Sequence, residues 1–188
     1  MANHFFISDT HFGHENIIRF TDDAGNRIRP FDSLSHMHEY MIQKWNSVVK
    51  QGDRVYVLGD VVINKAKGFP VMDRLNGKKL LVAGNHDPFD TLDYLEYFEK
   101  IYGVRVMKGA VFTHVPIHPH SLNDRSWKVN VHGHLHQNIV RLDNGHPDPR
   151  YINVSCEQLD YTPIALEDLR EKIWKTGVDR NKYPLTFY

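Results

Sequence analysis

The stretch Phe5–His11 (FFISDTH) decides the fold, because an apolar run ends there directly in two side chains that can bind a metal. Phe5–Ser8 is short and apolar, which predicts a buried strand. Four later apolar runs end in the same way, before Gly59-Asp60, Gly84-Asn85-His86-Asp87, His114 and Gly133-His134-Leu135-His136. Ligands collect at the carboxyl ends of strands in open α/β sheets. We therefore expect these five strand ends to meet at one site.

Amphipathic segments separate the apolar runs, and this alternation indicates an α/β protein. Ser33 can cap a helix over Leu34–Val49, where apolar residues recur at helical spacing. Further helices are expected at Thr91–Phe98 and Leu166–Trp174. The runs that predict strands after Phe5–Ser8 are Arg54–Leu58, Lys79–Ala83, Val104–Met107, Ala110–Thr113, Val129–Val131, Ile139–Leu142 and Ile152–Val154.

Length and composition limit the class of protein. The 188 residues fit a single domain over 1–188, and the pattern leaves the order of the tail 177–188 undefined. Lys+Arg and Asp+Glu balance at 23 each, which argues against an extended nucleic-acid surface. The one cysteine, Cys156, allows no intrachain disulfide, so we expect a buried thiol and a cytoplasmic protein. No run approaches the roughly 20 apolar residues that cross a bilayer, so no membrane partner is expected.

The side chains at the five strand ends form a coherent ligand set. A lone histidine at a strand end is usually an ordinary loop residue, but here carboxylates, imidazoles and one amide recur together without a thiolate. Such a set suits Mn²⁺, which we favour, or Fe, Zn²⁺, Co²⁺ or Ni²⁺. Seven ligands exceed what one tetrahedral ion takes and suffice for two ions that share a carboxylate. The ligands are Asp9, His11, Asp60, Asn85, His114, His134 and His136.

These motifs, in this order from Phe5 to about His136, resemble those of the calcineurin-like metallophosphoesterase superfamily, and in particular its small stand-alone bacterial and phage members. The resemblance implies a four-layer α-β-β-α sandwich of two mixed β-sheets flanked by helices, with two metals at the sheet ends. It assigns one ion to Asp9, His11 and His136. It assigns the other to Asn85, His114 and His134, with Asp60 as the bridge. His86 then faces the substrate.

The expected reaction is hydrolysis of a phosphate mono- or diester by a hydroxide that bridges the two ions. His86 is the candidate general acid, which favours diesters because a poor leaving group gains most from protonation. The expected partner is a small phosphorylated substrate such as a nucleotide. Further candidates for contacts with the substrate or with the ligands are His14, Asp87 and Arg125, and Arg29 is one of several cations expected at the rim or in solvent.

Two other functions fit parts of the pattern. A DNA or RNA nuclease would have the same ligands, but it would normally add a basic groove, which the balanced charge disfavours. A non-catalytic interaction scaffold would be expected to have lost ligands, yet all seven are present. Specificity is expected to lie in the loops Gly25–Pro30, Asn64–Pro70 and Pro116–Trp127.

Overall fold

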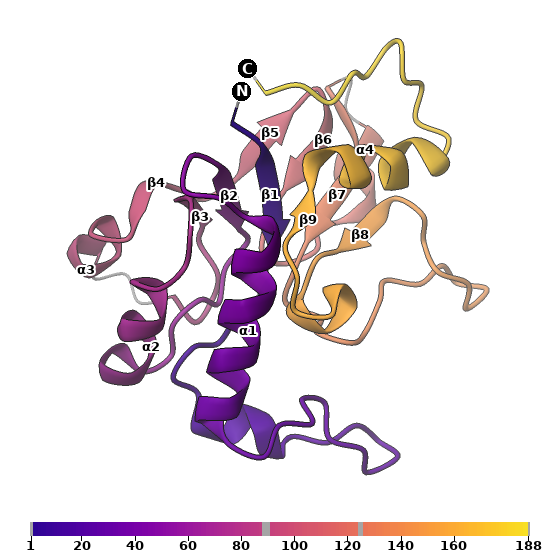
Figure 1. The fold of residues 1–188 in the computed structure, drawn as a ribbon. Coiled ribbons are helices and arrows are strands. Elements are labelled where there is room, and N and C mark those ends of the chain that lie inside the picture. The colour runs from indigo at the N-terminus through magenta and orange to yellow at the C-terminus, as the bar shows by residue number, and fades with distance from the viewer. Residues whose placement is uncertain (1, 88–90, 124–125, 188) are drawn as a thin grey trace.

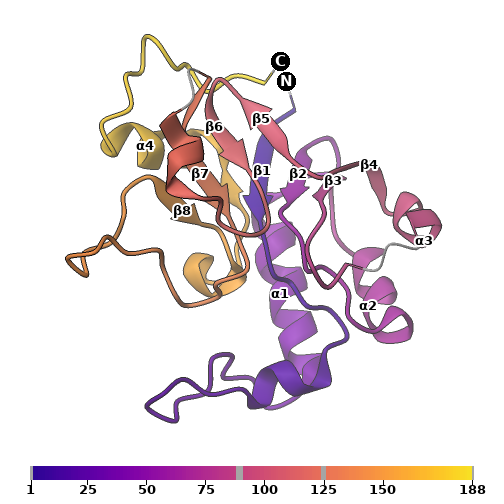
Figure 2. The same ribbon diagram turned by 180° about the vertical axis from the view of Figure 1, so that it is seen from behind.

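Two β-sheets face each other and helices flank them in the computed structural model, which describes residues 2–87, 91–123 and 126–187 (Figure 1, Figure 2). The first sheet has the order β4 (Phe98–Tyr102), β3 (Lys78–Val82), β2 (Arg54–Val57), β1 (His4–Ile7) and β9 (Ile164–Ala165). The second has the order β5 (Arg105–Met107), β6 (Gly109–Phe112), β7 (Trp127–His132) and β8 (Tyr151–Asn153). The expected α/β sandwich of two mixed sheets with flanking helices is confirmed.

The direction of the strands determines where their polar ends lie. Strands β1 to β4 are parallel, and β9 is antiparallel to β1. In the second sheet β6, β7 and β8 are parallel, and β5 is antiparallel to β6. Ile7 pairs with Val57, which pairs with Leu81, so β1, β2 and β3 end level with one another. The residues that follow these strands therefore leave the sheet at one edge.

Side chains of the first sheet alternate between two cores, since successive residues of a strand point to opposite faces. Phe5 and Ile7 enter the core under the helices α1 (Leu34–Val48), α2 (Lys65–Met72) and α3 (Thr91–Leu95). Phe6 enters the core between the sheets, where its ring stacks 5.0 Å from that of Phe112. Helix α4 (Leu166–Lys175) adds buried side chains to this second core. Burial on both faces explains why β1, β2 and β3 each end in a continuous run of buried residues, most of them apolar.

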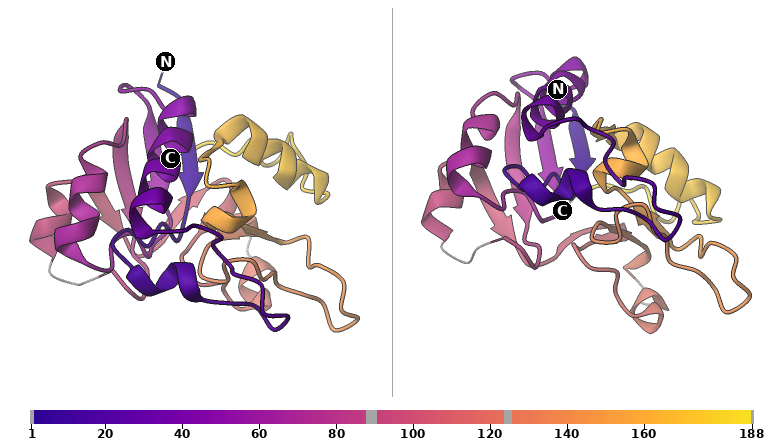
Figure 3. Two further views of the ribbon diagram at one scale, coloured as in Figure 1. Left: turned by 60° about the horizontal axis from the view of Figure 1, so that its bottom comes forward. Right: turned by 90° about the horizontal axis from the view of Figure 1, so that it is seen from below.

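The helix predicted after Ser33 is confirmed, and the Ser33 hydroxyl accepts a hydrogen bond from the backbone N–H of His36 at 3.1 Å. Short 3₁₀ helices η1 (Glu15–Arg19), η2 (Pro119–Asn123) and η3 (Cys156–Leu159) lie in the connections. The segment before α1, indigo in Figure 3, and the segment between β7 and β8, orange there, project on the same side of the molecule. Within the described ranges no helix is long and apolar enough to cross a membrane.

Three predicted segments differ from the structure. The helix expected over Thr91–Phe98 ends at Leu95, because Phe98 opens β4 and pairs with Lys79. The strand expected over Ile139–Leu142 is absent from the described structure, where Arg141 forms only an isolated bridge to Pro147 and β8 takes the place beside β7. The loop expected at Asn64–Pro70 lies mostly within α2, whose first turn is capped by the Asn64 side chain.

Candidate metal centre

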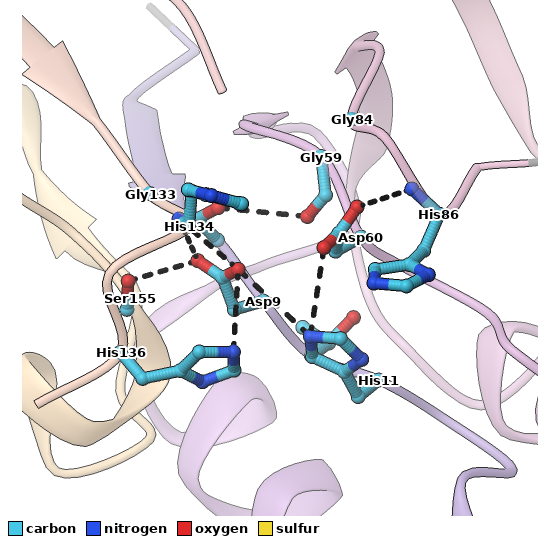
Figure 4. A network of polar contacts seen from close by, with 12 residues as sticks. Asp9, His11, Gly59, Asp60, Gly84, His86, Gly133, His134, His136 and Ser155 are labelled. Carbon is cyan, nitrogen blue, oxygen red and sulfur yellow. Dashed lines mark hydrogen bonds and ion pairs between the residues drawn. The ribbon is translucent and has the colours of Figure 1, made fainter. Parts of the chain in front are cut away.

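The carboxyl ends of five strands converge on one site, as the strand pattern predicts. Asp9 and His11 follow β1, Asp60 follows β2, and Asn85 and His86 follow β3. From the second sheet, His114 follows β6, and His134 and His136 follow β7. Figure 4 shows side chains from both sheets directed toward a common centre. The site therefore lies where the two sheets meet.

The first cluster consists of Asp9, His11 and His136, each with a ligand atom within 4.8 Å of the others. The Asp9 Oδ1 atom lies 3.9 Å from His11 Nε2 and 4.0 Å from His136 Nε2. Asp9 is fully buried, and its carboxylate accepts the backbone N–H of His134 at 2.9 Å and lies 2.8 Å from the Ser155 hydroxyl. These hydrogen bonds hold the carboxylate in place without using the imidazole nitrogens.

The second cluster consists of Asp60, His114 and His134, again within 4.8 Å. The His114 Nε2 atom lies 3.2 Å from Asp60 Oδ2 and 2.9 Å from Asn85 Oδ1. The same Asp60 oxygen lies 3.7 Å from His11 Nε2 in the first cluster. Asp60 thus stands between the two groups.

Backbone strain is concentrated at these residues. Among the described non-glycine residues, eight have a positive φ, and five of them are Asp9, His11, Asp60, His134 and His136. This conformation costs an L-residue about 1–2 kcal/mol, so it persists only where the surroundings impose it. The strained turns after β1, β2 and β7 bring these side chains close to one another.

Glycines permit the close approach of these turns. A Cβ atom on Gly133 would lie 1.9 Å from Ser8 Oγ and 2.4 Å from Asp9 Oδ2. A Cβ atom on Gly84 would lie 2.4 Å from Asp60 Oδ1. Any larger residue at these two positions would push a central carboxylate out of place.

The pKa values of two histidines of the centre are shifted in opposite directions. Burial, followed by the nearby Arg29 guanidinium, lowers the pKa of His11 to about 2, so its ring is neutral. Burial acts in the same sense on His114, but the hydrogen bond with Asp60 and the charges of Asp9 and Asp60 together outweigh burial and raise the His114 pKa. Burial opposes ionisation of Asp60 too, yet the interactions with His114 lower the Asp60 pKa to about 2. The Asp60 carboxylate and the His114 ring thus favour each other's charged forms at the position where a cation would bind.

The donor atoms fit divalent metal ions. Both ring nitrogens of His11 are buried and have no hydrogen-bond partner in the structure, which is costly unless a ligand satisfies them. A neutral imidazole between two carboxylates is a common metal-binding arrangement, and the mixture of N and O donors suits transition metals. The potential ligands form two groups, and Asp60 lies within 3.7 Å of a histidine from each.

A family model for calcineurin-like phosphoesterases matches residues 5–185. The chain belongs to the calcineurin-like phosphoesterase family. An uncharacterized protein of Methanocaldococcus jannaschii is 35% identical over 187 residues, which cover 96% of this chain and 96% of that protein. The Gene 66 protein of Mycobacterium phage L5 is 25% identical over 174 residues, covering 74% of this chain and 80% of the phage protein.

A solved structure extends the likeness to the fold. The crystal structure of a protein of unknown function from Aquifex aeolicus matches this calcineurin-like phosphoesterase with a TM-score of 0.71 and 26% sequence identity. The match covers 91% of this chain and 99% of that chain. The expected superfamily is therefore confirmed, and so is the likeness to small and phage proteins.

Two further histidines of the phosphoesterase, His86 and His14, lie beside the ligand His11. His86 is exposed, its backbone N–H donates to Asp60 Oδ1 at 2.9 Å, and its ring centre lies 5.9 Å from that of His11. The His14 ring lies 5.6 Å from the ring of His11 and 5.6 Å from that of Phe20. Burial, and then the nearby Arg29 and His86 charges, lower the pKa of His14.

Asp87, a candidate for contacts with the substrate or with the ligands, contacts the backbone of the ligand Asp60. Its carboxylate accepts backbone N–H groups from Asp60, Val61 and Gly84 at 2.7–2.9 Å, and the hydroxyl of Tyr94 at 3.2 Å. Asp87 therefore ties the loop after β3 to the loop after β2. Arg125, the remaining candidate, lies outside the described residues.

Three residues support the centre in ways that the sequence did not indicate. Arg29 is fully buried, although it was expected at the rim, and it donates to Glu157 and to the backbone carbonyls of Asp9 and Thr10. Glu157 and Ser155 follow β8 and contact the ligands His136 and Asp9. Ser155 and Glu157 could have been predicted, because they follow the predicted strand Ile152–Val154 directly. Arg29 could not, because its partner Glu157 is 128 residues away in the sequence.

Cys156 lies beneath the same ligands. Its Sγ atom donates to the Ser8 carbonyl at 3.1 Å, and the residue is fully buried, as expected. Burial raises the pKa of the Cys156 thiol well above its usual value. The raised pKa favours the neutral thiol, and Cys156 belongs to neither of the two clusters.

Replacing Gly133 with alanine is expected to displace Asp9, because the new Cβ atom would occupy the space of its carboxylate. We expect destabilisation of about 1–3 kcal/mol, the usual cost of overpacking, together with loss of metal bound by the first cluster. Denaturant unfolding and metal analysis of the purified variant measure the two effects. Gly103→Ala is the control, since its Cβ would meet no atom within 4 Å. Normal metal content in the Gly133 variant would contradict the argument.

Proposed function

We propose that this calcineurin-like phosphoesterase uses two metal ions to hydrolyse small phosphate esters, with a preference for diesters. Family membership and the two clusters of metal-capable side chains support a metal-dependent phosphoesterase in general. The observation that carries the binuclear proposal is the position of Asp60, whose Oδ2 atom lies 3.2 Å from His114 Nε2 and 3.7 Å from His11 Nε2. One carboxylate within reach of both clusters is suited to bridging two ions.

We propose that each cluster of ligands holds one of the two ions. Asp9, His11 and His136 would hold one ion, and Asn85, His114 and His134 the other. When bound, two divalent ions supply Lewis-acid activation of a water nucleophile and offset the charge of the phosphoryl oxygens. We favour Mn²⁺, because the donors are oxygen and imidazole nitrogen without a thiolate.

We assign His86 to the leaving group of the ester. Its backbone N–H is fixed by Asp60, while its ring is exposed beside the centre. From there the imidazolium can donate a proton to the departing oxygen as the ester bond breaks. A diester with an alkoxide leaving group gains more from this proton than an ester with an acidic phenol, and this supports the diester preference.

The remaining parts of the proposal concern partner and location. A formal net charge of zero supports a small substrate, such as a nucleotide, over an extended nucleic acid. Activity on long oligonucleotides with a steep salt dependence would contradict that choice. The free buried thiol of Cys156 supports a reducing, cytoplasmic location, which cell fractionation can test.

A metal-supplemented substrate screen tests the function directly. The metal-free chain is supplied with Mn²⁺ and assayed on nitrophenyl phosphate, bis-nitrophenyl phosphate and cyclic nucleotides. We expect activity that depends on added metal, is higher on diesters, and falls by at least about 100-fold in Asp60→Asn, which weakens the shared ligand. Full activity in Asp60→Asn would show that the bridging assignment is wrong.

Replacing His86 with alanine should slow the reaction according to the leaving group. Loss of a general acid typically costs about 10²- to 10⁴-fold in kcat. We expect a loss in that range on diesters with alkoxide leaving groups and a much smaller one on bis-nitrophenyl phosphate, with metal content unchanged. His146→Ala, which removes an exposed histidine of the β7–β8 loop, is the matched control. An equal loss on both kinds of diester would exclude the role of general acid.

His14 is proposed to contact the phosphate, since its ring lies beside His11 and its buried Nδ1 atom has no partner in the structure. His14→Ala should raise KM or lower kcat by about tenfold, the equivalent of one hydrogen bond to a charged group. Metal content should be unchanged, as metal analysis would verify. Asn16→Ala, an exposed neighbour on η1, serves as the control. Unaltered kinetics in His14→Ala would rule the contact out.

A further inference from the structure

The His136 ring contacts a buried ion pair, Arg29–Glu157, whose members belong to neither cluster. Its Nδ1 atom lies 2.9 Å from Glu157 Oε1, and Arg29 Nε lies 2.7 Å from the same oxygen. The Arg29 side chain is fully buried and the Glu157 side chain is 5% exposed. Arg29 also donates to the backbone carbonyls of Asp9 and Thr10, at the end of β1. One guanidinium thus joins the β1 turn to η3, which carries Glu157.

This arrangement fixes the orientation of the His136 ring. A carboxylate is an acceptor only, so the bond to Glu157 requires the proton of His136 to be on Nδ1. In the neutral ring that a metal requires, the Nε2 atom then carries the free lone pair, and it lies 4.0 Å from Asp9 Oδ1, on the side of the cluster. A carboxylate that orients a histidine in this way also makes it a better metal donor.

The second cluster has a different support. The Nδ1 atom of His114 lies 2.7 Å from the backbone carbonyl of Leu58, which is neutral and belongs to the turn after β2. Asp60 is held by the backbone N–H of His86 at 2.9 Å. Among the described contacts of His114 and Asp60 there is no counterpart of the Arg29–Glu157 pair. The two clusters therefore differ in the partner of a histidine Nδ1 atom, which is a charged carboxylate for His136 and a neutral carbonyl for His114.

We infer that Glu157 is a positioning residue for the ion held by Asp9, His11 and His136, and that Arg29 keeps Glu157 in place. The inference rests on the proposed binuclear centre and adds an asymmetry to it. Glu157 acts through His136 alone, so it sets the affinity of one ion and leaves the other unaffected. Arg29 neutralises the buried carboxylate, which would otherwise be costly to keep ionised.

Glu157→Gln tests this inference, because the amide keeps the size of the side chain and removes its charge. Metal-free protein is titrated with Mn²⁺ by calorimetry. We expect two binding events in the natural chain and, in the variant, a 10- to 100-fold weaker affinity at one of them only. Glu171→Gln is the matched control, since Glu171 is exposed on α4 and pairs with Arg180. It should bind both ions normally.

Single-site backgrounds identify which ion is affected. In His134→Ala, which weakens the second cluster, Glu157→Gln should still reduce the affinity of the remaining ion. In His136→Ala, which removes the residue through which Glu157 acts, the further change to Gln should have no effect on the remaining ion. An effect of equal size in both backgrounds, or no effect in either, would overturn the inference.

A measurement on the natural chain keeps the test independent of variant folding. In Zn²⁺-loaded, ¹⁵N-labelled protein, NMR should find His136 protonated at Nδ1 and ligated through Nε2. Ligation through Nδ1 would overturn the inference. A natural chain that binds no metal would instead overturn the proposed function on which the inference rests, whereas two bound ions with an unaltered Glu157→Gln would reject only the role of Glu157.

Discussion

The structure depends on the burial of two carboxylates, Asp9 and Asp60, where the two sheets meet. They are 0% and 2% exposed, and such burial is very costly for an ionised group unless hydrogen bonds and cations compensate it. Backbone N–H groups of His134 and His86 supply part of this compensation. The remaining negative charge favours the binding of metal ions. The strained turns and the small residues around them follow from this requirement.

Much of the fold and of the centre could be predicted from the sequence because each ligand follows its own strand directly. Parallel strands end at one edge of a sheet, so residues such as Asp9 and Asn85, which each follow a strand, can be predicted to lie close together. The helix after Ser33 was predictable for the same reason, since its cap and its apolar spacing are local. The grouping of the ligands followed from the family resemblance, and the structure places Asp9 with His11 and His136 as that grouping requires.

What could not be predicted depends on contacts between distant parts of the chain. Ile139–Leu142 is apolar enough for a strand, but β8 pairs with β7 in its place. Arg29 resembles any loop arginine in the sequence, because its burial depends on Glu157, 128 residues away. The sequence also did not reveal which groups Asp87 contacts, because its carboxylate accepts the backbone N–H groups of Asp60 and Val61 in the turn after β2. Contacts between residues that are far apart in the sequence leave no periodic pattern along the chain.

The buried thiol of Cys156 has a practical consequence. It is the chain's one cysteine, it is fully buried, and its raised pKa keeps it in the unreactive neutral form. A cysteine introduced on the surface would therefore be the single thiol open to alkylation in the folded protein. Spin labels or fluorophores can be attached at chosen loop positions without first removing Cys156 from beneath the ligands. Distances from such labels to a paramagnetic ion would then locate each metal separately in solution.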